Sequence, residues 1–422
     1  MHVRVGNVEP IFKAESLDLE VCVFVDNHIS GGVDTFLRTL LPRLSMHLKK
    51  IVLIVNANYP NIERVIDKCP DSLVVIRFSS IFQRPWFTRV GCIPRPPAVE
   101  KLLAIARRMS EYALLPNEIL KFRRLGVSSR ARVLVVNGGY PGSYSAIAAA
   151  IAFSKEHPTA LNVHNFAVKK KFPTLIIDWL IDRLVAKRVQ LFIGVSHLST
   201  DSLKDRISSA RLQSQVIYNA VEIGNLGLNN VTQQTSAPQT EKKVIGLIGT
   251  IEQRKGHFLA IEILAHLHTK NLCDRVMLRF VGSDPFFIQK SLSRHATTLG
   301  VSDSVAFVGY VENPIEKYSG VDVVIVPSLV NESFGLVPIE ALSLGIPVIA
   351  SSAGALPEIL QGMPNCTLIA NFDVESWANA LELALKTENN SSKVMQSEKL
   401  TRLCNPDRMA SEYLTAIFDL EN

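Results

Sequence analysis

The chain has 422 residues, of which 47% are hydrophobic and 20% are charged, and its formal net charge at pH 7 is +6. These values are typical of a large soluble enzyme and predict two domains, each with its own core. The amino terminus lacks the basic and then apolar plan of a signal peptide, and no apolar run approaches membrane-spanning length. We therefore expect a cytoplasmic protein without a transmembrane helix.

The six cysteines show no paired spacing, and several of them fall in apolar strand patterns. They predict reduced, buried thiols, and they argue against a zinc site or a disulfide framework. The six are Cys22, Cys69, Cys92, Cys273, Cys366 and Cys404.

Apolar strand patterns alternate with helical patterns along the whole chain, which predicts an α/β fold with parallel sheets. The first strand covers residues 21–25, Gly31 and Gly32 follow it, and a helical pattern begins at Val33. Glycines let a backbone approach a ligand closely, and the amino end of the helix is directed at the same place. Gly31 and Gly32 are therefore candidate ligand-binding residues.

A basic stretch between residues 77 and 132 contains twelve Arg or Lys against three Glu, and three lysines at 169–171 precede an apolar helix at 175–185. One interpretation is a face that binds an anionic membrane or a lipid diphosphate acceptor. The other is a solvated positive face over core aromatics, and the sequence leaves both open. No segment resembles a recognition helix or a stacking platform, so nucleic acid is not an expected partner. The aromatic residues in the basic stretch are Phe82, Trp86, Phe87 and Tyr112.

One histidine, His164, follows a predicted strand at residues 160–163. A lone histidine is more often a hydrogen-bonded structural residue than a catalytic one, so the local sequence favours a structural role.

A polar stretch at residues 226–242, rich in Asn, Gln, Thr and Ser, has no helical or strand period and contains Pro238. It predicts a linker between two domains. The predicted domains are residues 1–225 and 243–405, and helical spacing returns near the carboxyl terminus, at about 406–422.

The second domain begins with an apolar strand at residues 244–248, and the sequence GTIEQRKG follows it from Gly249 to Gly256. A glycine turn at a strand end with Arg254 and Lys255 can hold a diphosphate, Arg by its fork of donors and Lys as a point charge. The alternative is a solvated basic turn.

The most informative segment of the chain is a predicted strand at residues 321–326, a loop at 328–335, a helix from about Gly335 and a second strand at 348–350. In open parallel sheets, ligands bind outside the carboxyl ends of strands, so the loop faces a binding crevice. The start of the helix favours an anion such as a phosphate. Glu332 in the loop and Glu340 on the helix can then reach one ligand from two depths.

Two carboxylates beside an anion site suit a ligand that carries hydroxyls as well as phosphates, such as a nucleotide sugar. The alternative is an ordinary strand-loop-helix unit with solvated acids. The spacing resembles the donor-site signature of the GT4-type retaining glycosyltransferases (glycosyl transferases group 1), whose architecture is GT-B. The residues that carry the resemblance are Glu332, Ser333, Phe334, Gly335, Leu336, Pro338, Glu340 and Ala341.

This resemblance implies a GT-B fold, in which two Rossmann-like, doubly wound parallel-sheet domains face each other across a cleft. The helix near the carboxyl terminus is then expected to cross back and pack on the first domain. No cofactor and no metal are expected, because cationic side chains can stabilise the leaving diphosphate.

The resemblance also assigns roles to site residues. Lys255 is placed on the donor phosphates, and Arg254 supplies the charge of an arginine that many relatives carry where this chain has Thr250. Glu332 is placed on a donor sugar hydroxyl near the reaction centre, and Glu340 on the ribose hydroxyls. His164 is placed against the donor sugar. The expected substrate-binding residues are Gly31, Gly32, Thr250, Ser333, Phe334, Gly335, Leu336 and Glu340.

The implied activity is retaining transfer of a sugar from a nucleoside diphosphate to a hydroxyl of a glycan or a lipid-linked acceptor. The expected setting is bacterial surface polysaccharide or lipopolysaccharide biosynthesis, with peripheral contact at the inner face of the plasma membrane as an open alternative. A nucleotide-sugar epimerase and a catalytically idle nucleotide-binding scaffold are the rival interpretations. A dinucleotide dehydrogenase is disfavoured, because no Gly-x-Gly-x-x-Gly follows the first strand.

Overall fold

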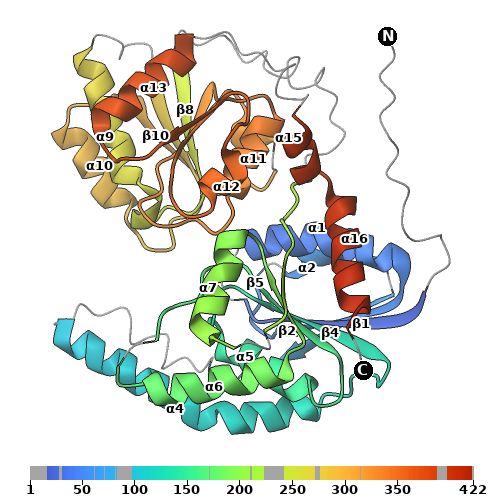
Figure 1. Ribbon diagram of the computed structural model, residues 1–422. Helices are drawn as coiled ribbons and strands as arrows, with labels where there is room; N and C mark the ends of the chain where they lie inside the picture. The colour runs from blue at the N-terminus through green and yellow to red at the C-terminus, as the bar shows by residue number, and fades with distance from the viewer. Residues whose placement is uncertain are drawn as a thin grey trace, which may run out of the picture. The chain divides into compact units, whose positions relative to one another are not determined.

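The structure is a computed structural model that describes residues 17–27, 31–60, 62–70, 72–80, 82, 97–170, 172–209, 212–222, 242–270, 276–313, 315–386 and 397–420. The chain forms two compact α/β units, each built on one parallel sheet (Figure 1). The first unit is Met1–Gly194, Thr200–Ile217 and Asp407–Asn422, and the second is Val195–Ser199 and Tyr218–Pro406. The prediction of two Rossmann-like parallel-sheet domains is confirmed.

The sheet of the first unit has the order β3-β2-β1-β4-β5-β6-β7, and all of its neighbouring strands run parallel. In chain order its elements are β1 (Leu17–Val25), α1 (Gly32–His47), β2 (Leu48–Asn56), α2 (Ile62–Ile66), β3 (Leu73–Phe78), α4 (Pro97–Arg123), β4 (Ala131–Asn137), α5 (Tyr144–Phe153), β5 (Thr159–Val163), α6 (Leu175–Arg188), β6 (Leu191–Gly194), α7 (His197–Ile207) and β7 (Ser214–Val216).

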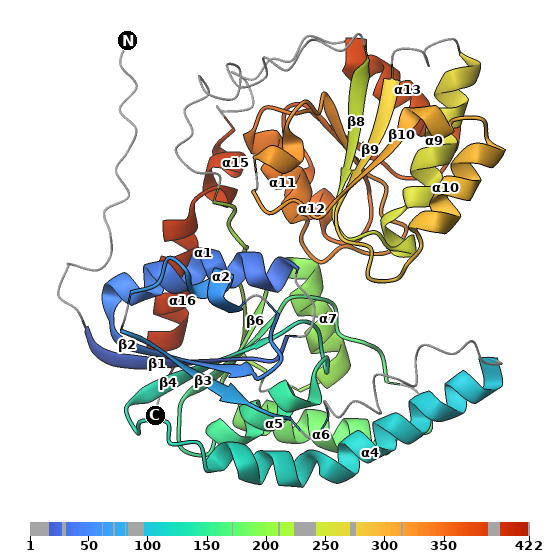
Figure 2. The same ribbon diagram turned by 180° about the vertical axis from the view of Figure 1, so that it is seen from behind.

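Helices cover both faces of this sheet, with α1 and α2 on one face and α4, α5 and α6 on the other (Figure 2). Alternate residues of a strand point to opposite faces, and Cys22 and Phe24 of β1 lie in the core beneath the second helix layer. Every residue of α5 is buried, because its five alanines and small neighbours let it lie close to the sheet.

The second unit has a six-stranded parallel sheet of order β10-β9-β8-β11-β12-β13. Its elements are β8 (Lys243–Ile248), η3 (Gln253–Lys255), α9 (His257–Thr269), β9 (Val276–Val281), α10 (Gln289–Thr298), η5 (Ser302–Ser304), β10 (Val305–Gly309), η6 (Glu316–Tyr318), β11 (Val323–Val326), α11 (Leu336–Ser343), β12 (Val348–Ser351), α12 (Leu356–Leu360), β13 (Cys366–Ile369), α13 (Val374–Lys386) and α15 (Glu398–Leu403).

The strand order of the second sheet reverses between β8 and β11. From β8 the chain winds outward through β9 and β10, and it then returns to the other side of β8 to form β11, β12 and β13. A reversal of this kind leaves a crevice at the carboxyl ends of the two central strands, where doubly wound folds bind ligands.

The last helix, α16 (Pro406–Phe418), packs on the first unit. Arg43 of α1 binds the carboxylate of Asp407 at 2.9 Å, and the ring of Tyr413 lies 5.4 Å from that of Phe36. Arg132 of β4 donates to the carbonyl of Ile417 at 3.3 Å. These contacts tie α16 to helix α1 and to strand β4 of the first unit.

The division into units differs in one place from the predicted domains. Residues 195–199 belong to the second unit, although they lie within the predicted first domain. Most of the predicted linker, residues 223–241, lies outside the described residues.

Four cysteines are described, and all four are free thiols. Cys22 is buried as predicted, whereas Cys69, Cys366 and Cys404 are only half-buried. Burial raises the pKa of the Cys22 thiol and that of the Cys366 thiol to about 12, which keeps both in the unreactive protonated form. Cys92 and Cys273 lie outside the described residues.

Within the described parts of the chain, no helix is both long enough and apolar enough to cross a bilayer.

Candidate functional site

The candidate site lies at the carboxyl ends of β8 and β11, the two strands that flank the reversal in the second sheet. The segment after β8 carries Arg254 and Lys255 on the short helix η3, and the loop after β11 carries Glu332. The backbone of the two segments is joined by a hydrogen bond from the Leu329 amide to the Arg254 carbonyl, at 2.8 Å. The two predicted halves of the site are therefore neighbours.

Lys255 and Glu332 form a close ion pair at the centre of this site. The Lys255 ammonium lies 2.6 Å from Glu332 Oε1, and the Ser328 hydroxyl donates to the same oxygen at 2.6 Å. Arg254 Nη1 lies 3.7 Å from that oxygen, and Arg254 Nη2 lies 2.6 Å from a carboxylate oxygen of Glu252. The structure thus brings three predicted residues together, and it adds Ser328, which the sequence did not single out.

The environment of Glu332 keeps its carboxylate ionised. Burial acts to raise the pKa of Glu332, but the charge and hydrogen bond of Lys255, the bond from Ser328 and the charge of Arg254 outweigh it, and the pKa is lowered. The side chain is 11% exposed and that of Lys255 is 22% exposed, so both ions are largely shielded from water. A ligand that reaches this pair meets localised charges of both signs.

Two glycines allow the close approach of backbone segments around the pair. Gly256 has φ +76°, and a Cβ there would collide with the carbonyl oxygen of Pro327. Gly354 has φ +63°, and a Cβ there would lie 2.6 Å from the Glu332 amide nitrogen. The Glu332 carbonyl also accepts a hydrogen bond from the Ala355 amide at 2.7 Å, which fixes the backbone that carries the carboxylate.

Glu340, on α11, is held by two residues that the sequence did not indicate. Tyr318 donates its hydroxyl to Glu340 Oε2 at 2.6 Å, and the Lys317 ammonium lies 2.9 Å from the same oxygen. Burial, the charge of Glu340 and this hydrogen bond raise the pKa of Tyr318 well above its ordinary value, so Tyr318 remains a donor. Lys317 and Tyr318 lie on η6, more than twenty residues before Glu340, and no local pattern links them to it.

The remaining residues of the predicted signature have distinct environments. Gly335 has φ +104° and precedes α11, so it provides the sharp entry to the helix. Ser333 and Leu336 are half-buried at that entry. Phe334 is 3% exposed, and its ring lies 6.1 Å from that of Tyr218 within the core. Phe334 therefore has a packing role in the structure, whereas the sequence placed it among the substrate-binding residues.

Thr250 lies in the turn after β8 and is half-buried. Its neighbour Gly249 has φ +132° and donates its amide to the Val281 carbonyl at 2.9 Å. The turn is pressed against the end of β9, because a Cβ on Gly282 would collide with the carbonyl oxygen of Gly249.

The other predicted residues lie in the first unit, again at strand ends. The Gly31 amide donates to the Asp34 carboxylate at 3.1 Å, and Asp34 also accepts from Tyr59 at 2.6 Å. Gly32 is exposed and begins α1. The amino end of α1 is therefore already occupied in part by a carboxylate of its own first turn.

His164 follows β5 directly, as predicted. Its ring lies 4.4 Å from the ring of Phe36 on α1, and its Nε2 atom is shielded from solvent. Burial lowers the pKa of His164 to about 3, so the imidazole is neutral near pH 7. In that state it can donate or accept a hydrogen bond but carries no charge.

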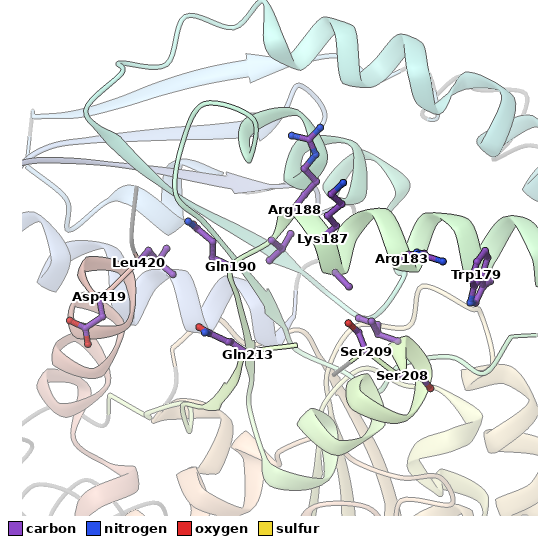
Figure 3. Close-up of a pocket in the computed structure, with 13 residues that line it drawn as sticks. Trp179, Arg183, Lys187, Arg188, Gln190, Ser208, Ser209, Gln213, Asp419 and Leu420 are labelled. Atoms are coloured by element: carbon purple, nitrogen blue, oxygen red, sulfur yellow. The ribbon is translucent and has the colours of Figure 1, made fainter. Parts of the chain in front are cut away.

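Part of the basic stretch proposed from the sequence can be located. Tyr112 is 8% exposed and Phe82 packs against the core, so these two aromatic residues belong to the core. Trp86 and Phe87 lie outside the described residues. A pocket of about 910 Å³ elsewhere in the first unit is lined mainly by residues of α6, by residues at and after the end of α7, and by Asp419 and Leu420, which follow α16 (Figure 3). It contains none of the predicted site residues.

Within the described residues, no three side chains of His, Cys, Asp or Glu come together as a metal site. The prediction that the protein works without a metal stays a prediction.

The comparison with known sequences concerns mainly the second unit. Residues 230–400 match the model of the family "Glycosyl transferases group 1". A D-inositol 3-phosphate glycosyltransferase of Corynebacterium jeikeium is 33% identical over 144 residues, which are 33% of this chain and 34% of that protein. The corresponding protein of Mycolicibacterium smegmatis is 33% identical over 152 residues, which are 35% and 34% of the two chains. The match thus spans about a third of the length of these curated relatives.

Solved structures resemble the whole fold. Anabaena Alr3699/HepE, crystallised in complex with UDP and glucose, superposes with a TM-score of 0.68 at 17% identity, over 95% of this chain and 100% of its own. WaaG, a glycosyltransferase involved in lipopolysaccharide biosynthesis, gives a TM-score of 0.63 at 15% identity, over 94% and 99% of the two chains. At these identities the likeness shows the fold alone. Residues 230–400 are therefore similar to the glycosyl transferases group 1, and the chain has the GT-B fold.

Proposed function

We propose that this protein transfers a sugar from a nucleoside diphosphate sugar to a hydroxyl group of an acceptor, with retention of the anomeric configuration. The observation that carries this proposal is the cluster of Lys255, Ser328 and Glu332 where the strand order of the second sheet reverses. That place in a doubly wound sheet binds nucleotides, and the cluster offers a cation for phosphates and a carboxylate for sugar hydroxyls. Glu340 follows in the chain, on α11.

The chemistry requires stabilisation of two opposite charges. When the bond between the anomeric carbon and the phosphate oxygen breaks, the diphosphate leaves with the electron pair and the sugar ring becomes cationic. The acceptor oxygen then forms its bond to the anomeric carbon, and its proton passes to the departing phosphate. Lys255, Arg254 and the amino end of α11 stabilise the diphosphate, as preorganised charges and dipoles do in a shielded site.

The ion pair of Lys255 and Glu332 has a role in this scheme. An ammonium has three donors, so Lys255 can bind a phosphate oxygen while one donor stays on Glu332. A donor phosphate then interacts with the positive charge of Lys255 together with Glu332. The Glu332 carboxylate can also accept a hydrogen bond from a sugar hydroxyl and stabilise the cationic ring. Because the pKa of Glu332 is lowered, its carboxylate is ionised over the whole neutral range.

Glu340 is suited to hold the ribose of the nucleotide. Among the described residues, Tyr318 and Lys317 donate hydrogen bonds to its Oε2 atom, and these bonds fix the orientation of the carboxylate. The ribose hydroxyls then donate to this prearranged acceptor, so the order of the site is established before the ligand arrives.

The donor and the acceptor are proposed from the structural relatives. Anabaena HepE was solved with UDP and glucose, and WaaG is involved in lipopolysaccharide biosynthesis. By analogy we propose a UDP-linked hexose as the donor and a glycan or lipid-linked acceptor in surface polysaccharide or lipopolysaccharide assembly. The donor site is proposed to work without a metal, with Lys255 and Arg254 in its place.

Three residues of the first unit are assigned to the same reaction. His164 is neutral and rigidly packed, and we assign it a hydrogen bond to the donor sugar. Gly31 and Gly32 are assigned to the diphosphate, which has to compete with the carboxylate of Asp34 for the Gly31 amide.

The test is donor turnover without an added acceptor, because water replaces the acceptor hydroxyl slowly in such sites. The protein is incubated with each common nucleotide sugar, and proton NMR follows the released sugar and its first anomeric form. Release of nucleoside diphosphate together with a sugar of the donor's own configuration supports the proposal. A sugar of altered stereochemistry at another carbon indicates an epimerase, and no release from any donor by a folded protein indicates an idle scaffold.

A further inference from the structure

Helix α6 of the first unit buries both of its acids and exposes several of its large apolar side chains. Its buried residues include both of its acids, Asp178 and Asp182, each 1% exposed. Five large apolar side chains of the same helix are exposed instead, and we call them the α6 ridge. The α6 ridge consists of Leu175, Ile176, Trp179, Leu180 and Leu184, with exposed fractions of 43%, 74%, 47%, 53% and 38%.

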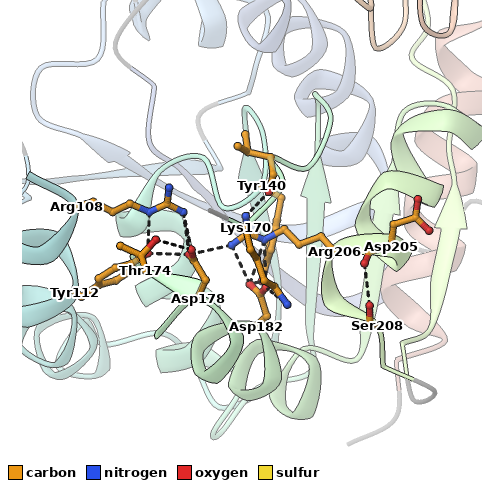
Figure 4. Close-up of polar contacts among 11 residues, drawn as sticks. Arg108, Tyr112, Tyr140, Lys170, Thr174, Asp178, Asp182, Asp205, Arg206 and Ser208 are labelled. Carbon is orange, nitrogen blue, oxygen red and sulfur yellow. Dashed lines mark hydrogen bonds and ion pairs between the residues drawn. The ribbon is translucent and has the colours of Figure 1, made fainter. Parts of the chain in front are cut away.

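A set of buried polar contacts fixes Asp178 on the inner side of α6 (Figure 4). Arg108 of α4 binds Asp178 Oδ1 at 2.9 Å, and Arg206 of α7 lies 3.1 Å from the same oxygen. The hydroxyls of Tyr112 and Thr174 donate to the carboxylate at 2.8 and 2.9 Å. Burial acts to raise the pKa of Asp178, but these donors and charges lower it, so the carboxylate is ionised in the interior.

Asp182, one turn further, is held in the same way (Figure 4). Arg206 Nε lies 3.2 Å from Asp182 Oδ2, the hydroxyl of Tyr140 donates to Oδ1 at 2.9 Å, and Lys170 Nζ lies 3.2 Å from Oδ2. A rotation of α6 that buried the ridge would break the ion pairs of both buried carboxylates with Arg206, which is strongly unfavourable. The two acids therefore hold α6 in the orientation that leaves the ridge exposed.

The charge on the outer side of α6 is positive only. Its exposed charged residues are Arg183 and Lys187, since both acids of the helix are buried and paired. The Arg183 guanidinium lies 5.3 Å from the ring of Trp179, which places a cation directly on the ridge. Beside the ridge, the pocket of about 910 Å³ is lined by Arg183, Lys187 and Arg188 against one acid, Asp419 (Figure 3).

We propose that the α6 ridge docks the protein onto an anionic lipid bilayer, with the helix lying in the plane of the interface. An apolar stripe that carries a tryptophan, on a helix whose exposed charges are all cations, is complementary to the boundary between acyl chains and anionic head groups. The 14 residues of α6 are too few to cross a bilayer, so the helix lies on the surface. The pocket beside it provides room for phosphate head groups near three cationic side chains. This inference goes beyond the proposed activity and does not depend on it.

The experiment is co-sedimentation of the full chain with vesicles of phosphatidylcholine alone and of phosphatidylcholine mixed with phosphatidylglycerol. The wild type is expected to partition onto the anionic vesicles only, and less so at high salt. The variants I176Q/L180Q and R183E/K187E are each expected to lower this partition by about tenfold or more. Because these side chains are exposed, thermal unfolding of the variants is expected to match the wild type, which confirms that they are folded.

Matched controls come from exposed helices of the second unit. K290E/R294E on α10 reverses two exposed cations at the same four-residue spacing, and L383Q on α13 removes an exposed leucine. Both controls are expected to bind vesicles as the wild type does. A blue shift of tryptophan emission on binding, absent in W179F, assigns the contact to the ridge.

The proposal is overturned if the wild type does not bind anionic vesicles or if it binds neutral vesicles equally well. It is also overturned if the ridge variants bind anionic vesicles as strongly as the wild type. A dimer in analytical ultracentrifugation that the ridge variants dissociate would instead make the ridge a contact between copies of the chain. Stabilisation of these variants by nucleoside diphosphates is expected to be unchanged, which separates failure of this inference from failure of the proposed activity.

Discussion

At the scale of single residues, the proposed donor site depends on contacts between side chains that are far apart in the sequence. Lys255 and Glu332 were both selected from the sequence, because each follows a buried strand that the apolar pattern marks clearly. Tyr318 and Ser328 could not be selected in this way. A tyrosine on a short turn and a serine after a proline are ordinary loop residues until the fold places their hydroxyls 2.6 Å from carboxylates.

Replacement of Lys255 by methionine keeps most of the volume of the side chain and removes its charge. We expect donor turnover to fall by about 10²–10³-fold, since the leaving diphosphate loses a preorganised cation. Steady-state kinetics with the donor identified by turnover provide the measurement. Lys243→Met is the matched control, because Lys243 begins β8, at the end of that strand away from η3, and pairs with Asp322 at 2.9 Å. Equal loss in both variants would remove Lys255 from the proposed site.

Replacement of Tyr318 by phenylalanine removes one of the two donors on the buried Glu340 carboxylate. We expect a loss of about 1–3 kcal/mol in the free energy of unfolding, because a hydrogen bond to a buried charge is removed. We also expect a higher KM for the donor with a smaller change in kcat. Denaturant unfolding and kinetics measure the two effects. Tyr310→Phe is the control at a tyrosine that is 58% exposed, and it should change neither quantity.

At the scale of elements, the sequence predicted three strands of the second sheet with ends within two residues of those observed, and it predicted the faces of the helices less well. The β-branched runs at residues 244–248 and 348–350 appear as β8 and β12 with their ends shifted by at most one residue. The apolar pattern at 175–185 predicted a helix correctly, but not which of its sides is buried. The buried side of α6 is determined by Arg108 and Arg206, which lie on two other helices. No local sequence pattern within α6 therefore indicates which side is buried.

The turn between β8 and α9 offers a test at this scale. Gly256→Ala adds a Cβ at φ +76° that collides with the Pro327 carbonyl, whereas Gly300→Ala adds one at φ +68° in open space. In both variants an alanine adopts the left-handed backbone conformation, which lowers the free energy of unfolding by about 1–2 kcal/mol. We expect the Gly256 variant to lose more stability than the Gly300 variant and to lose donor binding, because the backbone that carries Lys255 must move. Denaturant unfolding of the pair isolates the collision, and equal losses would contradict the close approach.

At the scale of the whole molecule, both units are doubly wound parallel sheets, and each contains one histidine that is kept neutral by burial. Burial lowers the pKa of His164 in the first unit to about 3. It also lowers the pKa of His257 in the second unit to about 4. The alternation of strands and helices in the sequence was sufficient to predict this architecture. The ring contacts that bury the two imidazoles could not be predicted from the sequence, because Phe36 and Phe280 lie on other elements.

The neutral imidazoles make stability depend on pH in a definite direction. Between about pH 3 and 6.5 the unfolded chain binds a proton at residue 164 that the folded chain does not, so stability rises with pH through this window. His164→Asn should flatten the rise by up to about 1.4 kcal/mol per pH unit. Unfolding midpoints measured from pH 4 to 7 test this, and an unchanged slope in the variant would contradict a neutral, buried His164.

The central claim is that the cluster of Lys255 and Glu332 binds the diphosphate of a nucleotide. The most direct measurement is thermal unfolding of wild type, Lys255→Met and the control Lys243→Met with UDP, GDP, ADP and CMP. A ligand that binds only the folded state stabilises it by about 2.7 kcal/mol at a hundred times its Kd. We predict that one nucleoside diphosphate raises the melting temperature of the wild type and of Lys243→Met, and that Lys255→Met loses this rise. Folded wild-type protein that none of the nucleotides stabilises, or a Lys255 variant that is stabilised fully, would contradict the claim.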